Sequence, residues 1–352
     1  MRIAVVNDVS MICTLLSNII HEHTKHEVIW TAADGQSAIE QARDNTPDLI
    51  LMDLIMPGIN GVDATCEIMK SSPCAIVVVT ASLDKNAEMV FSAMGHGALD
   101  AMSTPVLTED MDNSGIALFL RKIYLIDALI AKPKCDKNNQ KIPSSESLRT
   151  GQQQPLIAIG ASTGGPKALS TFLATLPDYI PASIVIIQHV DENFTQGLAD
   201  WLDNQCKLDV SVAKAGEYLD INKVYLAGGD QHLVLDHKLR FKYTSDPIEY
   251  PYRPSVDKFF HSINQVWPGP AIGVLLTGMG SDGAEGLLAL KHNGGLTIAE
   301  DESSCAVYGM PKAAVKLNAA HMVLPIHEIP VAILKVISQP TQRAASQTTQ
   351  WP

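Results

Sequence analysis

The chain has no excess of positive charge and no clustered cysteines. Its 26 Lys and Arg are outnumbered by 38 Asp and Glu, which gives a net charge of −12, and no basic run is interleaved with aromatic residues. We therefore expect no nucleic-acid-binding surface. The six cysteines are scattered and include no CxxC pair. This spacing argues against a disulfide framework or a zinc cluster and fits reduced thiols in a cytoplasmic protein.

Signals for membranes and secretion are also missing. No apolar run approaches the ~18 residues that a membrane-spanning helix needs. The first residues, MRIAVVNDVS, lead directly into a strand-like pattern, without the basic and apolar regions of a signal peptide. We expect a cytoplasmic protein without direct membrane insertion.

What the 352-residue sequence does contain is hydrophobic residues, 46% in all, in two successive α/β patterns. In residues 1–130, five β-rich runs alternate with segments whose apolar residues recur at helical spacing, as at Ile12, Leu15, Leu16 and Ile19. The runs cover residues 3–6, 28–32, 48–53, 75–80 and 98–102. This (βα)5 pattern predicts a parallel sheet with helices on both faces.

The second α/β pattern follows a polar stretch. Residues 131–154 have almost no large apolar side chains, so we expect a flexible linker there. Residues 155–338 predict a second, mostly parallel α/β domain, and residues 339–352 a disordered tail. The expected strands of this domain are 156–160, 183–188, 223–227 and 271–277, followed by 295–301 and 321–325.

Polar residues end several strands of the first domain. Asn7 and Asp8 follow the first strand, Asp53 ends the third and Thr80 ends the fourth. In a parallel sheet these positions meet at one edge, where carboxylates and a backbone carbonyl could hold Mg²⁺. One carboxylate could then attack a phosphoryl group. The alternative is that Asp8 and Asp53 only cap helices or turns.

The motifs VVND, LMDLIMPGINGV, VVTAS and ALDAMSTP resemble those of a two-component receiver domain over essentially the first 125 residues. The resemblance implies a flavodoxin-like fold, Mg²⁺ held by Asp8 with Asn7 and Asp53, and Asp53 as acceptor of phosphate from a CheA-like histidine kinase. It also implies that Thr80 is the switch residue. Two departures stand out, because Asn7 replaces a usual acid and Thr104 replaces a usual lysine, so that no cation is available there.

A glycine-rich segment opens the second domain, LIAIGASTGGP over residues 156–166. Its G-x-S-x-G pattern is typical of a nucleophile elbow, but an α/β-hydrolase elbow normally lies several strands into its sheet, and this one follows the first strand. A dinucleotide-binding loop would require G-x-G-x-x-G and an acid after the next strand. His189 stands at that position instead.

His189 suggests a different interpretation. Ser162, His189 and Asp282 each follow an expected strand, so all three could meet at one sheet edge as a nucleophile, a base and an orienting acid. Backbone N–H groups near Thr163 or in the TGMGSDG loop could bind the oxyanion. The alternative is a structural histidine together with an aspartate that makes an Asx-turn.

Six motifs in order then resemble the chemotaxis protein-glutamate methylesterase family, CheB, over residues 155–330. They are GASTGGP, IIQHV, VYLAGGDQHL, RPSVD, LLTGMGSDGAEG and AEDESSCAVYGMPKAA. The resemblance implies that Ser162, His189 and Asp282 form a catalytic triad and that Thr163 and the Met279 backbone serve the oxyanion. The segments VVNDVS, LMDLIMPG and FSAMGHGALDA are similar in sequence to those of the Wsp-type branch. Gly229 stands where the family usually has proline, and this departure puts none of the catalytic residues in doubt.

The resemblance implies a phosphorylation-regulated serine esterase. Its substrates would be glutamate γ-methyl esters on methylated chemoreceptor-like membrane proteins, its product methanol, and it could also deamidate receptor glutamines. The esterase chemistry would need no cofactor, and the receiver would cover the catalytic edge until phosphorylated. One rival is a receptor-docking protein without hydrolysis, although no triad member is replaced. Another is a DNA-binding regulator, which would need a basic helix-turn-helix domain that the sequence does not show.

Overall fold

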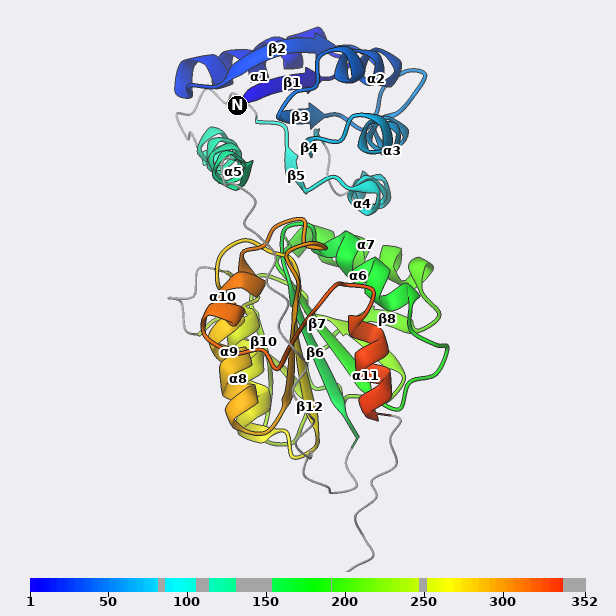
Figure 1. Cartoon of the computed structure of the whole chain (residues 1–352), viewed down its shortest axis with the longest axis vertical. Coiled ribbons are helices and arrows are strands. Elements are labelled where there is room, and N and C mark those ends of the chain that lie inside the picture. The colour runs from blue at the N-terminus through cyan, green and yellow to red at the C-terminus, as the bar shows by residue number, and fades with distance from the viewer. Residues whose placement is uncertain (82–85, 106–113, 131–153, 191, 247–251, 338–352) are drawn as a thin grey trace, which may run out of the picture. The chain divides into compact units, whose positions relative to one another are not determined.

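The computed structural model describes residues 1–81, 86–105, 114–130, 154–190, 192–246 and 252–337 (Figure 1). The chain divides into two compact units, one built mainly on residues 1–141 and the other mainly on residues 142–352. The expected tail and most of the expected linker lie outside the described residues. No helix within the described ranges is both long and apolar enough to cross a membrane.

The first unit is a five-stranded parallel sheet with strand order β2-β1-β3-β4-β5. This is the flavodoxin-like order, so the fold predicted for this unit is confirmed. Its elements are β1 Arg2–Val6, α1 Ser10–His23, β2 Glu27–Ala32, α2 Gly35–Asp44, β3 Leu49–Met52, α3 Gly61–Ser71, β4 Ala75–Thr80, α4 Ala87–His96, β5 Asp100–Ser103 and α5 Ser114–Ile130.

Local sequence explains where these elements begin and end. Asp34 and Asn60 cap α2 and α3 by accepting hydrogen bonds from backbone N–H groups three residues later. β5 starts two residues later than predicted, because Gly97 ends α4 in a left-handed conformation and Ala98 N–H still bonds back to α4. Alternating strand residues such as Val5, Leu51 and Val77 are fully buried under α1 and α5.

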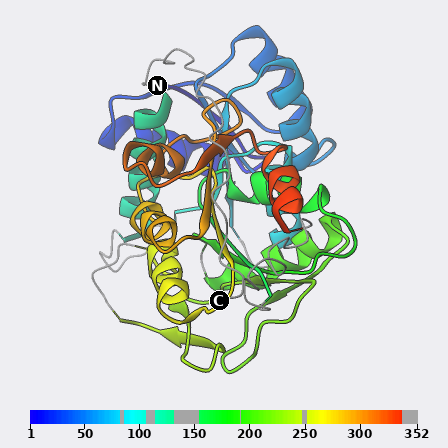
Figure 2. The same ribbon diagram turned by 60° about the horizontal axis from the view of Figure 1, so that its bottom comes forward.

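The second unit is built on a seven-stranded sheet, all of whose neighbouring strands are parallel, in the order β14-β13-β12-β6-β7-β9-β8. Figures 1 and 2 show α8, α9 and α10 on one face and α6, α7 and α11 on the other. The strands are β6 Leu156–Ala161, β7 Ser183–Gln188, β8 Asp209–Val212, β9 Lys223–Leu226, β10 His232–Leu235, β11 Phe241–Thr244, β12 Ala271–Leu275, β13 Leu296–Glu300 and β14 Met322–Leu324. The helices are α6 Gly165–Ala174, α7 Glu192–Gln205, α8 Val256–Val266, α9 Ala284–His292, α10 Met310–Lys316 and α11 Ile329–Ile337.

Three short strands of this unit were not predicted. β8 pairs with β9 at the sheet edge, and β10 and β11 form an antiparallel hairpin outside the main sheet. Each has only four residues and includes at least one polar residue, so none forms the continuous apolar run that marks β3, which is also four residues long. Gln154, the last residue of the expected linker, donates hydrogen bonds to Ser183 Oγ and Leu219 O at 3.0 Å. Gln154 therefore belongs to the folded second unit.

Candidate active site

The carboxyl ends of three adjacent strands, β12, β6 and β7, define the site. Ser162 directly follows β6, and its N–H donates to Thr277 O in the segment after β12 at 3.0 Å. His189 directly follows β7, and its N–H donates to Ala161 O at 3.1 Å. These bonds continue the parallel ladders by one residue beyond the strands, so backbone pairing fixes where both side chains leave the sheet.

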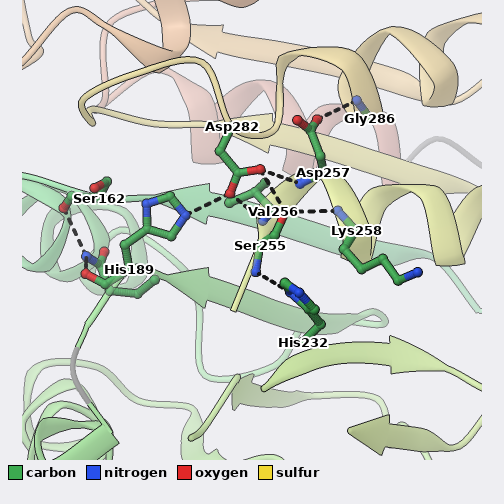
Figure 3. Close-up of polar contacts among 10 residues, drawn as sticks. Ser162, His189, His232, Ser255, Val256, Asp257, Lys258, Asp282 and Gly286 are labelled. Carbon is green, nitrogen blue, oxygen red and sulfur yellow. Dashed lines mark hydrogen bonds and ion pairs between the residues drawn. The ribbon is translucent and has the colours of Figure 1, made fainter. Parts of the chain in front are cut away.

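His189 and Asp282 form a buried pair. His189 Nε2 lies 2.8 Å from Asp282 Oδ2, and both side chains are more than nine-tenths buried. His189 Nδ1 is also buried and has no hydrogen-bond partner within the described part of the chain. In the view of Figure 3 the imidazole lies between Ser162 and Asp282. With Nε2 committed to the carboxylate, Nδ1 is the nitrogen that can take a proton.

The N-terminus of α8 holds Asp282 from the other side (Figure 3). Ser255 Oγ donates to Oδ1 at 2.8 Å, Val256 N–H to Oδ2 at 2.7 Å and Asp257 N–H to Oδ1 at 3.1 Å. Burial alone would raise the pKa of Asp282, but the hydrogen bond and charge of His189, with the Val256 and Asp257 N–H groups, lower its pKa overall. Asp282 therefore stays ionised and can stabilise an imidazolium.

A glycine lets α8 come this close to the sheet. An ideal Cβ on Gly160, in β6, would lie 2.3 Å from Val256 Cγ1, so only glycine leaves room for the first residue of α8. Val256 is fully buried at this contact. Ser255, the N-cap of α8, is fully buried as well.

The loop after β12 lies against the serine. An ideal Cβ on Gly278 would lie 2.7 Å from Ser162 Cβ and 3.1 Å from Ser162 N, which places the Gly278 backbone in contact with the backbone of Ser162. Met279 is the next residue of this loop and is partly buried. Thr163 lies in the turn between β6 and α6. Of the two predicted oxyanion residues, Thr163 therefore directly follows Ser162, and Met279 directly follows Gly278.

Sequence reasoning missed three supports of this site. Ser255 and the α8 N-terminus hold Asp282, and Tyr252 stacks on His189. Glu300, which ends β13, is fully buried and accepts a hydrogen bond from Thr277 N–H at 2.7 Å; its burial, first of all, raises its pKa. A serine after proline at a helix start, as in RPSVD, is a capping signal that could have pointed to Ser255. No comparable local signal marks Tyr252 or Glu300.

The first unit has its own polar site at the carboxyl ends of β1 and β3, between which the strand order reverses. Asn7 Nδ2 donates to Asp53 Oδ2 at 2.9 Å, and Leu54 N–H donates to Oδ1 at 2.7 Å. Burial raises the pKa of Asp53 and the charge of Asp8 raises it further, although the N–H groups of Leu54 and Ile55 act in the opposite direction. A bound cation would offset the free-energy cost of keeping the Asp53 carboxylate ionised in this buried position.

The oxygen atoms available near Asp53 are suitable ligands for Mg²⁺. The carboxylates of Asp8 and Asp53 are hard oxygen ligands, and Mg²⁺ tolerates a site in which waters complete the coordination. No group of three or more His, Cys, Asp and Glu that could hold a metal occurs among the described residues. Asn7 turns its amide nitrogen to Asp53, and its oxygen accepts from Val9 N–H at 2.9 Å. The two carboxylates therefore fit the ion, and Asn7 orients Asp53.

The switch residue predicted in this unit, Thr80, ends β4 and is buried. Its Oγ1 accepts a hydrogen bond from Asn86 Nδ2 at 3.2 Å. Thr104 follows β5 and donates its N–H to Thr80 O at 3.0 Å. Thr104 Oγ1 is buried without a hydrogen-bond partner among the residues that the structure describes.

Fold and site together define a class, a receiver domain combined with a parallel-sheet α/β enzyme domain. Residues 3–114 match the family model "Response regulator receiver domain", and residues 157–333 match "CheB methylesterase". The chain belongs to the CheB methylesterase family. The predicted fold class and the predicted enzyme class, a methylesterase with a receiver domain, are thereby confirmed.

Individual proteins agree with this assignment. The chain is 49% identical to "Protein-glutamate methylesterase/protein-glutamine glutaminase 2" of Cupriavidus metallidurans, over 94% of this chain and 96% of the relative. It is 44% identical to the protein numbered 3 of the same name in Pseudomonas syringae pv. tomato, over 96% of this chain and 100% of the relative. The CheB methylesterase catalytic domain of Thermotoga maritima, a solved structure, is 37% identical, with a TM-score of 0.51 over 53% of this chain and 100% of that domain.

Proposed function

We propose that Ser162, His189 and Asp282 act as a catalytic triad that hydrolyses glutamate γ-methyl esters on methylated chemoreceptor-like membrane proteins. One observation carries the proposal: His189 Nε2 is bound to a carboxylate that stays ionised, while its buried Nδ1 has no partner in the described part of the chain. The names of the relatives support the substrate class, since they combine glutamate methylesterase with glutamine glutaminase.

The chemistry follows from the roles of the three side chains. Ser162 Oγ attacks the ester carbonyl carbon while its proton moves to His189 Nδ1, and Asp282 stabilises the imidazolium. Backbone N–H groups at Thr163 and Met279 would stabilise the oxyanion, because the Gly278 loop lies against Ser162. The bond to the methoxy group then breaks, and His189 returns the proton to release methanol. Water hydrolyses the acyl-enzyme by the same steps, which yields glutamate and free Ser162.

The same intermediate permits a second reaction. A glutamine side chain would form the same acyl-enzyme, with ammonia instead of methanol as the leaving group. We therefore include receptor glutamine deamidation in the proposal. Neither reaction needs a cofactor in this domain, because the groups above supply the nucleophile, the base and the oxyanion site.

For the first unit we propose regulation by phosphorylation. Asp53 would accept phosphate from a CheA-like histidine kinase, and Asp8 with Asp53 would hold Mg²⁺, which would neutralise charge between the carboxylate and the phosphodonor. Asn7 orients Asp53 through its amide, and Thr80 would bind the phosphoryl group in place of Asn86. The motifs VVNDVS and LMDLIMPG support placement in the Wsp-type branch.

The proposal extends to organisation and place in the cell. We take residues 1–130 as the receiver, 131–154 as a linker whose last residue, Gln154, packs with the second unit, and 155–338 as the methylesterase domain. We take residues 339–352 as the tail. The cytoplasm is the compartment in which a histidine kinase and receptor signalling helices would both be accessible, and the scattered cysteines fit it.

The test is methanol release from membranes that carry methyl-labelled receptors. We expect release by the full-length wild type and a loss of more than about 10³-fold in Ser162→Ala and in Asp282→Asn. Release should rise when a small-molecule phosphodonor is added and should not rise in Asp53→Asn. Absence of release by the wild type, from receptors that an established methylesterase demethylates, would overturn the esterase and favour a receptor-docking protein.

A further inference from the structure

A tyrosine covers one face of the proposed general base. The rings of His189 and Tyr252 are stacked, with centroids 4.3 Å apart and planes inclined by only 7°. Tyr252 is partly buried. An ideal Cβ on Gly280 would lie 3.5 Å from the Tyr252 hydroxyl, so the ring reaches from the segment before α8 to the loop that carries Asp282.

The segment 252–257 therefore contacts two members of the proposed triad. Its first residue stacks on His189, and its last three donate hydrogen bonds to Asp282. Among the described residues the imidazole has one hydrogen bond, between Nε2 and Asp282, which fixes one edge of the ring but leaves rotation about that bond open. A parallel ring on one face restricts this rotation and so keeps Nδ1 aimed in a single direction.

Stacking also changes the charge environment of the base. The face of an aromatic ring is electronegative, so it attracts a cation placed over it. When His189 takes the proton of Ser162 it becomes such a cation, with Asp282 at its edge and the Tyr252 ring over its face. The same ring keeps water from that face, which strengthens both interactions.

We propose that Tyr252 is a positioning residue for the esterase reaction: it holds the His189 imidazole in its productive plane and stabilises the imidazolium that forms in the transition state. The inference rests on the proposed triad and adds a residue to it. The π-face is the essential feature, so the hydroxyl is dispensable and an aliphatic side chain of similar size is not a substitute.

Three variants of the full-length chain separate these contributions. Tyr252→Phe keeps the ring, and we expect wild-type kcat. Tyr252→Leu keeps an apolar cover without a π-face, and we expect kcat to fall about 3- to 30-fold with KM unchanged. Because the imidazolium loses stabilisation while water stays excluded, the acidic limb of the pH profile of kcat/KM should move to lower pH. Tyr179→Leu is the matched control, since Tyr179 is 58% exposed and precedes β7 at the end opposite His189.

Two readouts do not depend on the methyl-ester substrate. The stacked ring should shift the imidazole proton signals of His189 upfield in the NMR spectra of the wild type and Tyr252→Phe, but not of Tyr252→Leu. The rate at which a fluorophosphonate probe labels Ser162 should follow the same order as kcat. Loss of the upfield shift without any fall in kcat or labelling rate, or an equal fall in Tyr252→Phe and Tyr252→Leu, would overturn the role of Tyr252. Labelling that persists in Ser162→Ala would instead overturn the triad.

Discussion

The Ser255 hydroxyl donates a hydrogen bond to Asp282 Oδ1 over 2.8 Å while the same oxygen accepts from Lys258 N–H and caps helix α8. One side chain thus serves both the helix and the proposed catalytic acid. His232 Nδ1 in turn accepts from Ser255 N–H at 3.2 Å, and His232 is fully buried. The position of Asp282 is therefore tied to the folding of α8 and to the hairpin strand β10.

Ser255→Ala should lower both stability and rate. Loss of the cap and of a buried hydrogen-bond donor is expected to cost about 1–3 kcal/mol, and kcat should fall because Asp282 loses one of the groups that orient it. Urea unfolding and methanol release measure the two effects. Asn60→Ala, which removes the cap of α3 in the first unit, is the control: it should lower stability without lowering the phosphodonor-activated kcat. A Ser255→Ala variant with normal kcat would show that the backbone N–H groups of Val256 and Asp257 are sufficient to hold Asp282 in place.

Gly278→Ala should disrupt the surroundings of Ser162, the proposed nucleophile. The added Cβ would lie 2.3 Å from Met310 Sδ and 2.7 Å from Ser162 Cβ, so the loop or the serine must move. A displacement of about 1 Å at a catalytic group can cost about 10²-fold in rate. Gly115→Ala is the control, because its Cβ meets nothing within 4 Å and it lies in helix α5. Equal methanol release by the two variants would contradict the packing described for the loop.

The buried carboxylate of Asp257 should make stability depend on pH. Burial raises the pKa of Asp257 to about 6, and the nearby charge of Asp282 raises it too, although Gly286 N–H donates to Oδ1 at 2.6 Å. A carboxyl whose folded pKa lies above its unfolded value contributes stability at low pH that is lost as pH rises through the folded pKa. The unfolding free energy should therefore fall between about pH 4 and pH 6.

Asp257→Asn tests this dependence, because the amide oxygen can still accept from Gly286 N–H. Urea titrations across this range should show a fall that is smaller than in the wild type by on the order of 2 kcal/mol. Asp34→Asn is the control, because the pH dependence contributed by Asp34 has the opposite sign. The Ser37 N–H lowers the pKa of Asp34, so the stability that this carboxylate contributes is lost as pH falls. An unchanged slope in Asp257→Asn would show that another group carries the titration.

Thr104→Val should not weaken the first unit. The Thr104 hydroxyl is buried without a partner in the described residues, so replacing it by a methyl group of similar shape removes an unsatisfied polar group. We expect the unfolding free energy to stay the same or to rise by up to about 1 kcal/mol. Thr80→Val is the comparison, because it deprives Asn86 Nδ2 of its acceptor and should destabilise. A clear loss of stability in Thr104→Val, measured by thermal unfolding, would indicate that the hydroxyl has a partner.

The sequence was sufficient for the strands that are buried on both faces. Runs such as those of β6 and β7 consist of residues that are all buried, and a continuous apolar run is a local property that can be recognised without knowing the fold. It was not sufficient for β8, β10 and β11, because four residues with partly exposed neighbours do not differ in pattern from a loop.

By itself the sequence determined the two α/β units, their order and the candidate residues Ser162, His189, Asp282 and Asp53. Strand ends and glycine-rich turns can be recognised because they depend on residues that are adjacent in the sequence. Only the tertiary structure decided which imidazole nitrogen meets Asp282, which side chain and helix terminus hold Asp282, and that Tyr252 stacks on the His189 ring. Those relationships join residues 25 to 93 positions apart in the chain. Long-range packing and hydrogen-bond geometry create them, and neither has a local signature in the order of the residues.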